Sequence, residues 1–97
     1  MAHCPLERLA DLHDVLAAVR TWPGVIEKHP AVFYLRREPF LHFHLLPGPR
    51  RRADVKGVHD WLQVELPEPM TERARRALGR ELRHRYTERT RGARSTR

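Results

Sequence analysis

Apolar residues occupy alternate positions in two stretches of this chain, residues 40–46 (FLHFHLL) and residues 61–66 (WLQVEL). Side chains of a β-strand alternate between the two faces of a sheet, so a period of two predicts two half-buried strands. The core face is predicted to hold the fully apolar sets: Leu41, Phe43, Leu45, Leu62, Val64 and Leu66. The opposite, more polar face is predicted to hold Phe40, His42, His44, Leu46, Trp61, Gln63 and Glu65.

Apolar residues at helical spacing precede and follow these strands. Between residues 5 and 20 they recur every three or four positions, at Leu6, Leu9, Leu12, Leu16 and Val19. This spacing predicts an amphipathic helix with one apolar face. A second helix is predicted from Thr71, a residue type that caps helix N-termini, to Tyr86.

Three shorter segments between the helices are rich in β-branched or aromatic residues. Residues 25–27 and 31–36 are predicted strands, and 53–58 is a candidate for another. Residues 36–39 (RREP) are predicted to form a hairpin loop, and 47–52 (PGPRRR) a longer loop, because proline and glycine disfavour regular structure. The order predicts an α+β fold, with an antiparallel sheet of three to four strands and an N-terminal and a C-terminal helix packed on one face. Residues 1–86 are predicted to be the single domain.

The length of 97 residues suits one small domain. No apolar run approaches the roughly 18 residues of a membrane-spanning helix, so we expect no membrane partner. The N-terminal residues lack the basic start and apolar stretch of a signal peptide. The single cysteine, Cys4, cannot form an internal disulfide, which fits a reducing compartment, so we expect a cytoplasmic protein.

Positive charge is concentrated at the C-terminal end. Residues 73–97 contain ten arginines and two glutamates, whereas residues 1–72 contain nine Lys and Arg against ten Asp and Glu. Residues 87–97 hold one apolar side chain, Ala93, and are predicted to form a flexible, arginine-rich tail. The candidates for phosphate contacts with nucleic acid are Arg73, Arg76, Arg80, Arg83, Arg89, Arg91 and Arg94. A solvated helix face is the alternative interpretation of this stripe.

His42 and His44 lie two residues apart on one predicted strand. Their Cβ atoms would be roughly 6–7 Å apart, which lets both imidazoles reach one divalent metal ion. Further ligands would come from Asp54, His59 or Asp60. The alternatives are general acid–base chemistry, since an imidazole titrates near pH 6.5, and half-exposed polar residues on a wet sheet face. The pattern leaves these alternatives open, and it indicates no other cofactor.

Other common catalytic patterns are missing from the sequence. The five glycines form neither a dinucleotide-binding nor a phosphate-loop motif. The only serine, Ser95, lies in the predicted tail, so a serine hydrolase is excluded. Cys4 has no second cysteine in a CxxC arrangement. These observations favour a non-enzymatic role over catalysis.

The landmarks WPGV (22–25), VFYLR (32–36), LHFH (41–44), Asp54, His59, Trp61 and Tyr86 resemble, in their order, the luciferase-domain family of small bacterial proteins of unknown function. The resemblance covers about two-thirds of the chain, and the loop around residues 47–55 looks shortened. It implies a compact helix–sheet–helix domain and directs attention to His42, His44, Asp54, His59 and Trp61. A weaker similarity to MmcQ/YjbR-like domains implies the same architecture and stresses the strand of Trp61. Neither family implies a reaction.

The expected function is a non-enzymatic module that binds a ligand or a protein on its open sheet face. We expect a homodimer, since a small core gains from extra buried area. Nucleic-acid binding through the last helix and the tail is the first alternative. A metal-dependent site built on His42 and His44 is the second.

Overall fold

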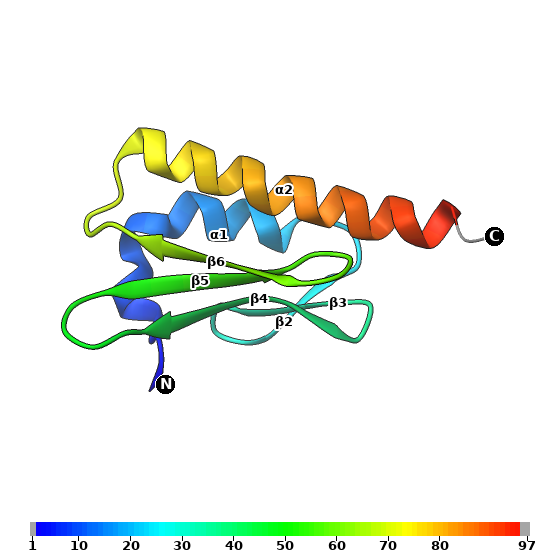
Figure 1. The fold of residues 1–97 in the computed structure, drawn as a ribbon. Coiled ribbons are helices and arrows are strands. Elements are labelled where there is room, and N and C mark those ends of the chain that lie inside the picture. The colour runs from blue at the N-terminus through cyan, green and yellow to red at the C-terminus, as the bar shows by residue number, and fades with distance from the viewer. Residues whose placement is uncertain (1, 96–97) are drawn as a thin grey trace.

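The computed structural model describes residues 2–95, with side chains for residues 2–91. Within this part of the chain a six-stranded antiparallel sheet is joined to two α-helices (Figure 1). The elements are β1 (Ala2–His3), the 3₁₀ helix η1 (Leu6–Leu12), α1 (His13–Arg20), β2 (Val25–His29), β3 (Val32–Leu35), β4 (Glu38–Leu45), β5 (Arg51–Lys56), β6 (Trp61–Leu66) and α2 (Glu72–Ser95). The predicted α+β class is confirmed. The predicted three to four strands were too few, because all five candidate strand segments join the sheet and the unpredicted β1 adds a sixth strand.

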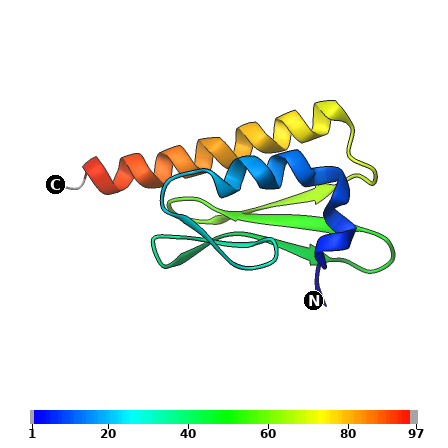
Figure 2. The ribbon, with the colours of Figure 1, turned by 180° about the vertical axis from the view of Figure 1, so that it is seen from behind.

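The strands follow the order β2-β3-β4-β5-β6, and β1 pairs with the second half of β4 beyond the end of β3. Figures 1 and 2 show both helices on the same side of this sheet. The other side, which we call the open face, has no helix over it in the described part of the chain. None of the described helices is long and apolar enough to cross a membrane.

The core fills the space between the sheet and the two helices. Leu12, Leu16 and Val19 come from the first helical segment, and Leu78 and Leu82 from α2. They pack against buried strand residues, which are Phe33, Leu35, Phe40, Leu41, Phe43, Ala53, Val55 and Leu66. At one end the rings of Trp22, Phe40 and Tyr86 contact one another, with centroids 5.1–6.4 Å apart.

The alternation predicted for β4 and β6 holds except at one residue. Phe43 is fully buried, whereas His42 and His44 are half-buried on the open face, and Trp61 is 41% exposed. Phe40 was predicted on the histidine face but is fully buried against Trp22 and Tyr86. The register explains this, because Phe33 pairs with Leu41 while Tyr34 pairs with Pro39. Phe40 is therefore the extra residue of a β-bulge, and a bulge reverses the alternation locally.

The helices differ from the sequence prediction at two places. The predicted first helix is divided into η1 and α1, because Leu9 and Leu12 have non-helical dihedral angles. The second helix begins as predicted, and the hydroxyl of Thr71 accepts the N–H of Ala74 at 3.0 Å. It does not end near Tyr86 but continues to Ser95, so residues 87–95 of the predicted tail are helical.

Both predicted loops are shorter than expected. Leu35 pairs with Glu38, so the β3–β4 hairpin turns on Arg36 and Arg37 alone. Both arginines have positive φ, 54° and 71°, which is the backbone of a type I′ turn and usually belongs to Asn and Gly. The loop predicted at 47–52 ends earlier, because β5 already begins at Arg51.

Arg51 is a fully buried charge beneath the sheet, on the side of the helices. Its guanidinium donates to both carboxylate oxygens of Asp11, at 2.8 and 3.0 Å, and to the carbonyls of Arg8 and Pro67. Asp11 also accepts the N–H of Met70 at 2.7 Å. The pKa of Asp11 is lowered to about 2, mainly by the hydrogen bonds from Arg51. This ion pair ties η1, β5 and the segment before α2 together.

Candidate functional site

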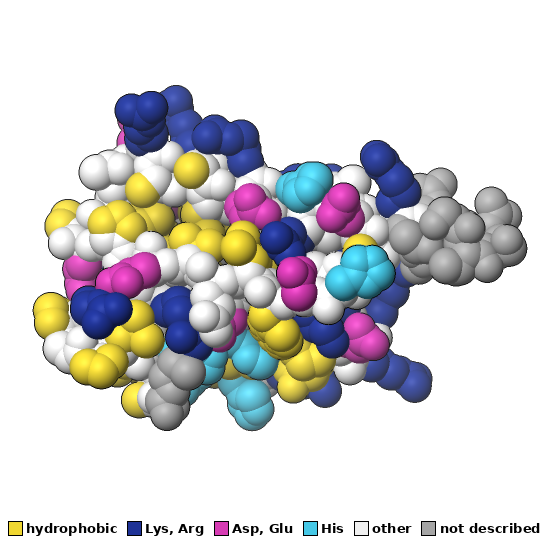
Figure 3. Space-filling view, viewed as in Figure 1, with side chains coloured by type: hydrophobic (Ala, Val, Ile, Leu, Met, Phe, Trp, Pro, Cys, Tyr) yellow, Lys and Arg dark blue, Asp and Glu magenta, His cyan; other side chains and the backbone are white. Residues whose placement is uncertain are grey.

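Four side chains with aromatic or imidazole rings gather on the open face, and we call them the ring cluster: Tyr34, His42, His44 and Trp61. The ring of His42 lies 5.7 Å from Trp61, 6.2 Å from Tyr34 and 6.2 Å from His44, between centroids. In Figure 3 a group of histidine side chains lies at the lower edge of the view, while other histidines stand apart from it. Strands β3, β4 and β6 supply the rings, so the sheet register positions them.

Asp54 and Arg52 of β5 lie beside the imidazoles. In the register His42 pairs with Asp54 and His44 with Arg52. Arg52 donates to both carboxylate oxygens of Asp54 at 2.7 and 3.0 Å. The Nε2 atom of His44 lies 3.4 Å from Oδ2 of the same carboxylate. Asp54 is therefore held between a guanidinium and an imidazole on a rigid central strand.

The imidazoles of His42 and His44 stay neutral around pH 7. Burial is the main cause that lowers the pKa of each below its ordinary value. The mutual proximity of the two rings adds to the lowering for His42, whereas the negative charge of Asp54 opposes it for both residues. A neutral imidazole carries one proton and one acceptor lone pair. In His44 the carboxylate of Asp54 favours the proton on Nε2, which leaves Nδ1 as the acceptor.

Two ring nitrogens of the cluster lie just below the surface without a hydrogen-bond partner among the described residues. They are Nε2 of His42 and Nδ1 of His44. A buried polar atom without a partner costs about 1–3 kcal/mol. Because both atoms are buried, a ligand on this face would reach them only after the imidazoles move.

The structure brings together four of the five residues singled out for ligand or metal binding. His42, His44, Asp54 and Trp61 belong to one patch, whereas His59 is exposed in the turn between β5 and β6. Asp60 is directed to α2, where it pairs with Arg85 at 3.4 Å. Among the described residues, no group of three or more His, Cys, Asp or Glu side chains could hold a metal ion.

Several arginines predicted to contact nucleic acid also make contacts within the fold. Arg76 pairs with Glu72 at 2.6 Å, and Arg83 lies over the rings of Trp22 and Tyr86. Arg89 is almost buried and donates to the carbonyl of Pro39 at 2.9 Å. The exposed candidates are Arg73, Arg76, Arg80, Arg83 and Arg91. The side chain of Arg94 lies outside the described ones.

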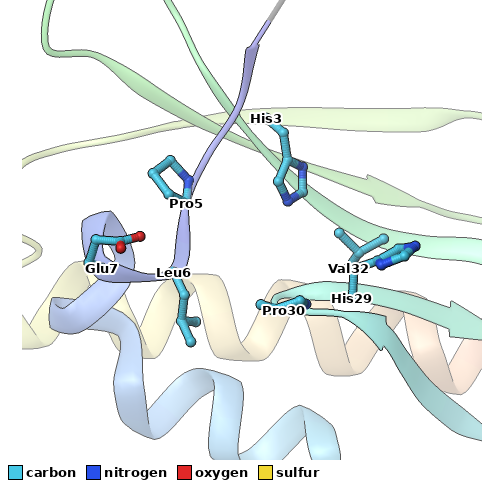
Figure 4. Close-up of a pocket in the computed structure, with 7 residues that line it drawn as sticks. All are labelled: His3, Pro5, Leu6, Glu7, His29, Pro30 and Val32. Atoms are coloured by element: carbon cyan, nitrogen blue, oxygen red, sulfur yellow. The ribbon is translucent and has the colours of Figure 1, made fainter.

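Two surface pockets were not predicted from the sequence. A cavity of about 630 Å³ lies between the N-terminal segment, with His3, Leu6 and Glu7, and the β2–β3 turn, with His29 and Val32 (Figure 4). A groove of about 310 Å³ runs between β6 and α2 and appears as the band of hydrophobic side chains in Figure 3. Both depend on contacts between distant segments, so no local pattern marks them. His3 pairs with His44, which places the cavity next to the ring cluster.

Comparison with known proteins gives this chain no relatives: no family model, no curated protein and no solved structure matches it. The similarity to the luciferase-domain family therefore stays a prediction. The functional argument rests on the geometry of the open face.

Proposed function

We propose that this chain is a cytoplasmic, non-enzymatic binding module that takes a ring-bearing ligand on its open sheet face. One observation carries the proposal: among the described residues, a sheet face with no helix over it presents an exposed indole beside two neutral imidazoles, each with a buried ring nitrogen that lacks a partner. A flat apolar ligand ring would gain contact with Trp61. Donor groups on the ligand would supply hydrogen bonds to the two imidazoles once these rings turn their buried nitrogens towards the surface.

The surroundings of the cluster support binding more than catalysis. Asp54, the carboxylate nearest the imidazoles, already accepts two hydrogen bonds from Arg52, and Nε2 of His44 lies 3.4 Å from it. A general base needs a free lone pair within hydrogen-bond reach of the substrate. The contacts of Asp54 leave fewer of its lone pairs free. The same contacts fix the patch in one shape, which lowers the entropy cost of binding a ligand.

The proposal can be tested by ¹H–¹⁵N NMR with a panel of small heteroaromatic compounds that carry N–H donors. We expect shift changes at the Trp61 indole N–H and at residues around His42 and His44. Cyclohexanol is the apolar control and should cause smaller changes. The variant Trp61→Ala should lose most of the response, whereas Val58→Ala, in the nearby turn, should keep it. Changes confined to the groove between β6 and α2, or none at all, would contradict the proposal.

We also propose that two copies pair through β6 to form the expected homodimer. In the described part of the chain β6 is a sheet edge with regular register, and such an edge readily accepts another strand. An antiparallel register with Gln63 opposite Gln63 of the second copy places Leu62 opposite Val64 on the side of the groove. Apolar positions then face apolar positions, as an isologous interface requires. Self-pairing would also cover part of the groove.

Sedimentation velocity over a wide concentration range tests the dimer. We expect a monomer–dimer equilibrium that Gln63→Lys weakens at least tenfold, because two like charges would face each other at the two-fold axis. The matched control Gln63→Thr, a good strand former, should leave the equilibrium unchanged. A monomer at every concentration would contradict the dimer without affecting the ring cluster.

A further inference from the structure

We infer that the ligand of the open face is a single-stranded nucleic acid, whose bases stack on the ring cluster and whose phosphates contact the basic end of the sheet. This inference rests on the proposed function and names its ligand class. Two groups of residues carry it: the rings of β3, β4 and β6, and the cations around them.

The rings form a row across the sheet. Tyr34, His42 and Trp61 follow one another at centroid distances of 6.2 and 5.7 Å. Successive bases of a single strand can be splayed over such spacings and stack on aromatic faces. The partnerless nitrogens of His42 and His44 are buried beside this row, so they would accept the amino or imino hydrogens of bases only after the imidazoles turn towards the surface.

The charges of the open face favour a polyanion. Two cations there are neutralised by carboxylates, in the pairs Arg50–Glu65 and Arg52–Asp54, and Lys56 lies 3.9 Å from Glu38. The ammonium group of Lys28 instead lies over the ring of Tyr34, 4.4 Å from its centroid. Within the described residues Lys28 makes no ion pair, so it remains available to a phosphate beside the first ring of the row.

The turn of the β3–β4 hairpin extends this basic region. Arg36 and Arg37 are exposed, and neither forms an ion pair with a described carboxylate. Both occupy the left-handed backbone region, where a non-glycine residue is unfavourable. The turn lies two residues beyond Tyr34, at the end of the sheet that also holds the β5–β6 turn (Figure 1). A contact with the phosphates of a nucleic acid bound along the row of rings would explain why two arginines occupy this unfavourable turn.

The same geometry disfavours a duplex. In double-stranded DNA each base is stacked on both faces, so rings set in a flat sheet cannot reach a base face. The open face also lacks a protruding helix or ribbon that would enter a major groove. A single strand should therefore bind more tightly than a duplex of the same length.

Fluorescence anisotropy with labelled dT12, rU12 and a 12-base-pair duplex, at several salt concentrations, tests the inference. We expect the single strands to bind at least tenfold more tightly than the duplex at 0.15 M salt. Trp61→Ala should weaken single-strand binding about 5- to 100-fold, because it removes the stacking of about one base. The exposed turn variant Val58→Ala is the control and should bind normally.

The double variant Arg36→Asn, Arg37→Gly tests the phosphate contacts without endangering the fold. Asn–Gly is the preferred sequence for a type I′ turn, so this variant should unfold at the same or a higher temperature. Its affinity for dT12 should fall, and the slope of log K against log salt should decrease by about 1.4, the value for two phosphate contacts on a single strand. Arg73→Gln with Arg80→Gln, on α2, should change the affinity less.

Three results would overturn the inference: equal affinity for duplex and single strand, unchanged binding of Trp61→Ala, or loss of binding only when the α2 arginines are replaced. If dT12 and rU12 fail to bind while heteroaromatic compounds still shift the Trp61 indole signal, the nucleic acid is wrong and the proposed binding face stands. If neither class of probe binds the open face, the proposed function fails as well.

Discussion

The two faces of one sheet differ in how completely their side chains are satisfied. On the covered face, apolar residues pack against two helices, and the buried guanidinium of Arg51 makes four hydrogen bonds, although its Nε has no partner among the described residues. On the open face, two imidazole nitrogens have no partner and an indole is 41% exposed. A folded chain normally satisfies its buried polar groups. The difference indicates that the covered face maintains the fold and that the open face is where binding should be sought.

Phe40 gives the sharpest test of where the covered face ends. Phe40→Ala should destabilise the protein by about 3–5 kcal/mol, because it leaves a cavity against Trp22 and Tyr86. Ile26→Ala, on a side chain that is 60% exposed, is the control and should change stability little. Urea denaturation measures both. Equal small effects would mean that Phe40 follows the strand alternation and that the bulge is absent.

Arg51 tests the buried charge of the covered face. Arg51→Ala should cost about 3 kcal/mol or more, because it leaves the carboxylate of Asp11 without its main partner. Arg50→Ala breaks the neighbouring, exposed pair with Glu65 and should have little effect in the same urea titration. A loss for Arg51→Ala no larger than that for Arg50→Ala would contradict the role of this ion pair.

The lowered pKa of Asp11 also predicts that the protein loses stability in acid. Its pKa is about 2 in the folded state, below the ordinary value of 3.8. The corresponding stability is present above about pH 4 and is lost as the pH falls towards 2. Asp11→Asn should lower stability at pH 7 and flatten the profile below pH 4, as measured by thermal unfolding. If Asp11→Asn unfolds with the same pH dependence as the wild type, other groups cause the acid transition.

The open face should respond in the opposite direction to an apolar substitution. His42→Phe replaces a buried nitrogen that has no partner and keeps a ring beside Trp61, so it should raise stability by about 1 kcal/mol. Phe43→His, the neighbouring substitution on the covered face, should destabilise the protein strongly. Unfolding temperatures compare the two. Destabilisation by His42→Phe would show that the imidazole is already satisfied.

The lowered pKa values of the two imidazoles predict the smallest effect, which is a loss of stability in mild acid. Their folded-state pKa values are lowered, so below about pH 6.5 the unfolded chain binds protons that the folded chain does not. Stability should therefore be complete above pH 6.5, fall as the pH drops from there towards the folded-state values, and level off below them. Replacing both residues with glutamine should remove this slope, and an unchanged slope would place it elsewhere.

Local patterns predicted the elements that depend on periodicity. The alternation in residues 61–66 gave β6 and its two faces, and Thr71 marked the start of α2. The pair His42 and His44 was placed on the open face for the same reason. Phe40 was misplaced because a bulge depends on the pairing partner, and the partner is not visible in a local pattern.

The C-terminal helix shows the same limit. Residues 87–91 contain no apolar side chain, so the pattern predicted a flexible tail. In the structure Arg89 lies over the ring of Phe40 and donates to backbone carbonyls of the β3–β4 hairpin. A charged side chain can thus continue a helix by packing its stem on the sheet.

The sequence by itself determined the α+β class and the concentration of charge near the C-terminus. It also determined which side chains of β4 and β6 lie on each face of the sheet, apart from Phe40. Tertiary structure decided the number of strands, the position of Phe40, the burial of Arg51 and the gathering of Tyr34, His42, His44 and Trp61 into one cluster. The physical reason is the separation along the sequence of the residues that decide each feature. Periodicity is a property of neighbouring residues, whereas bulges, buried ion pairs and ring clusters arise only when segments distant in the sequence come into contact.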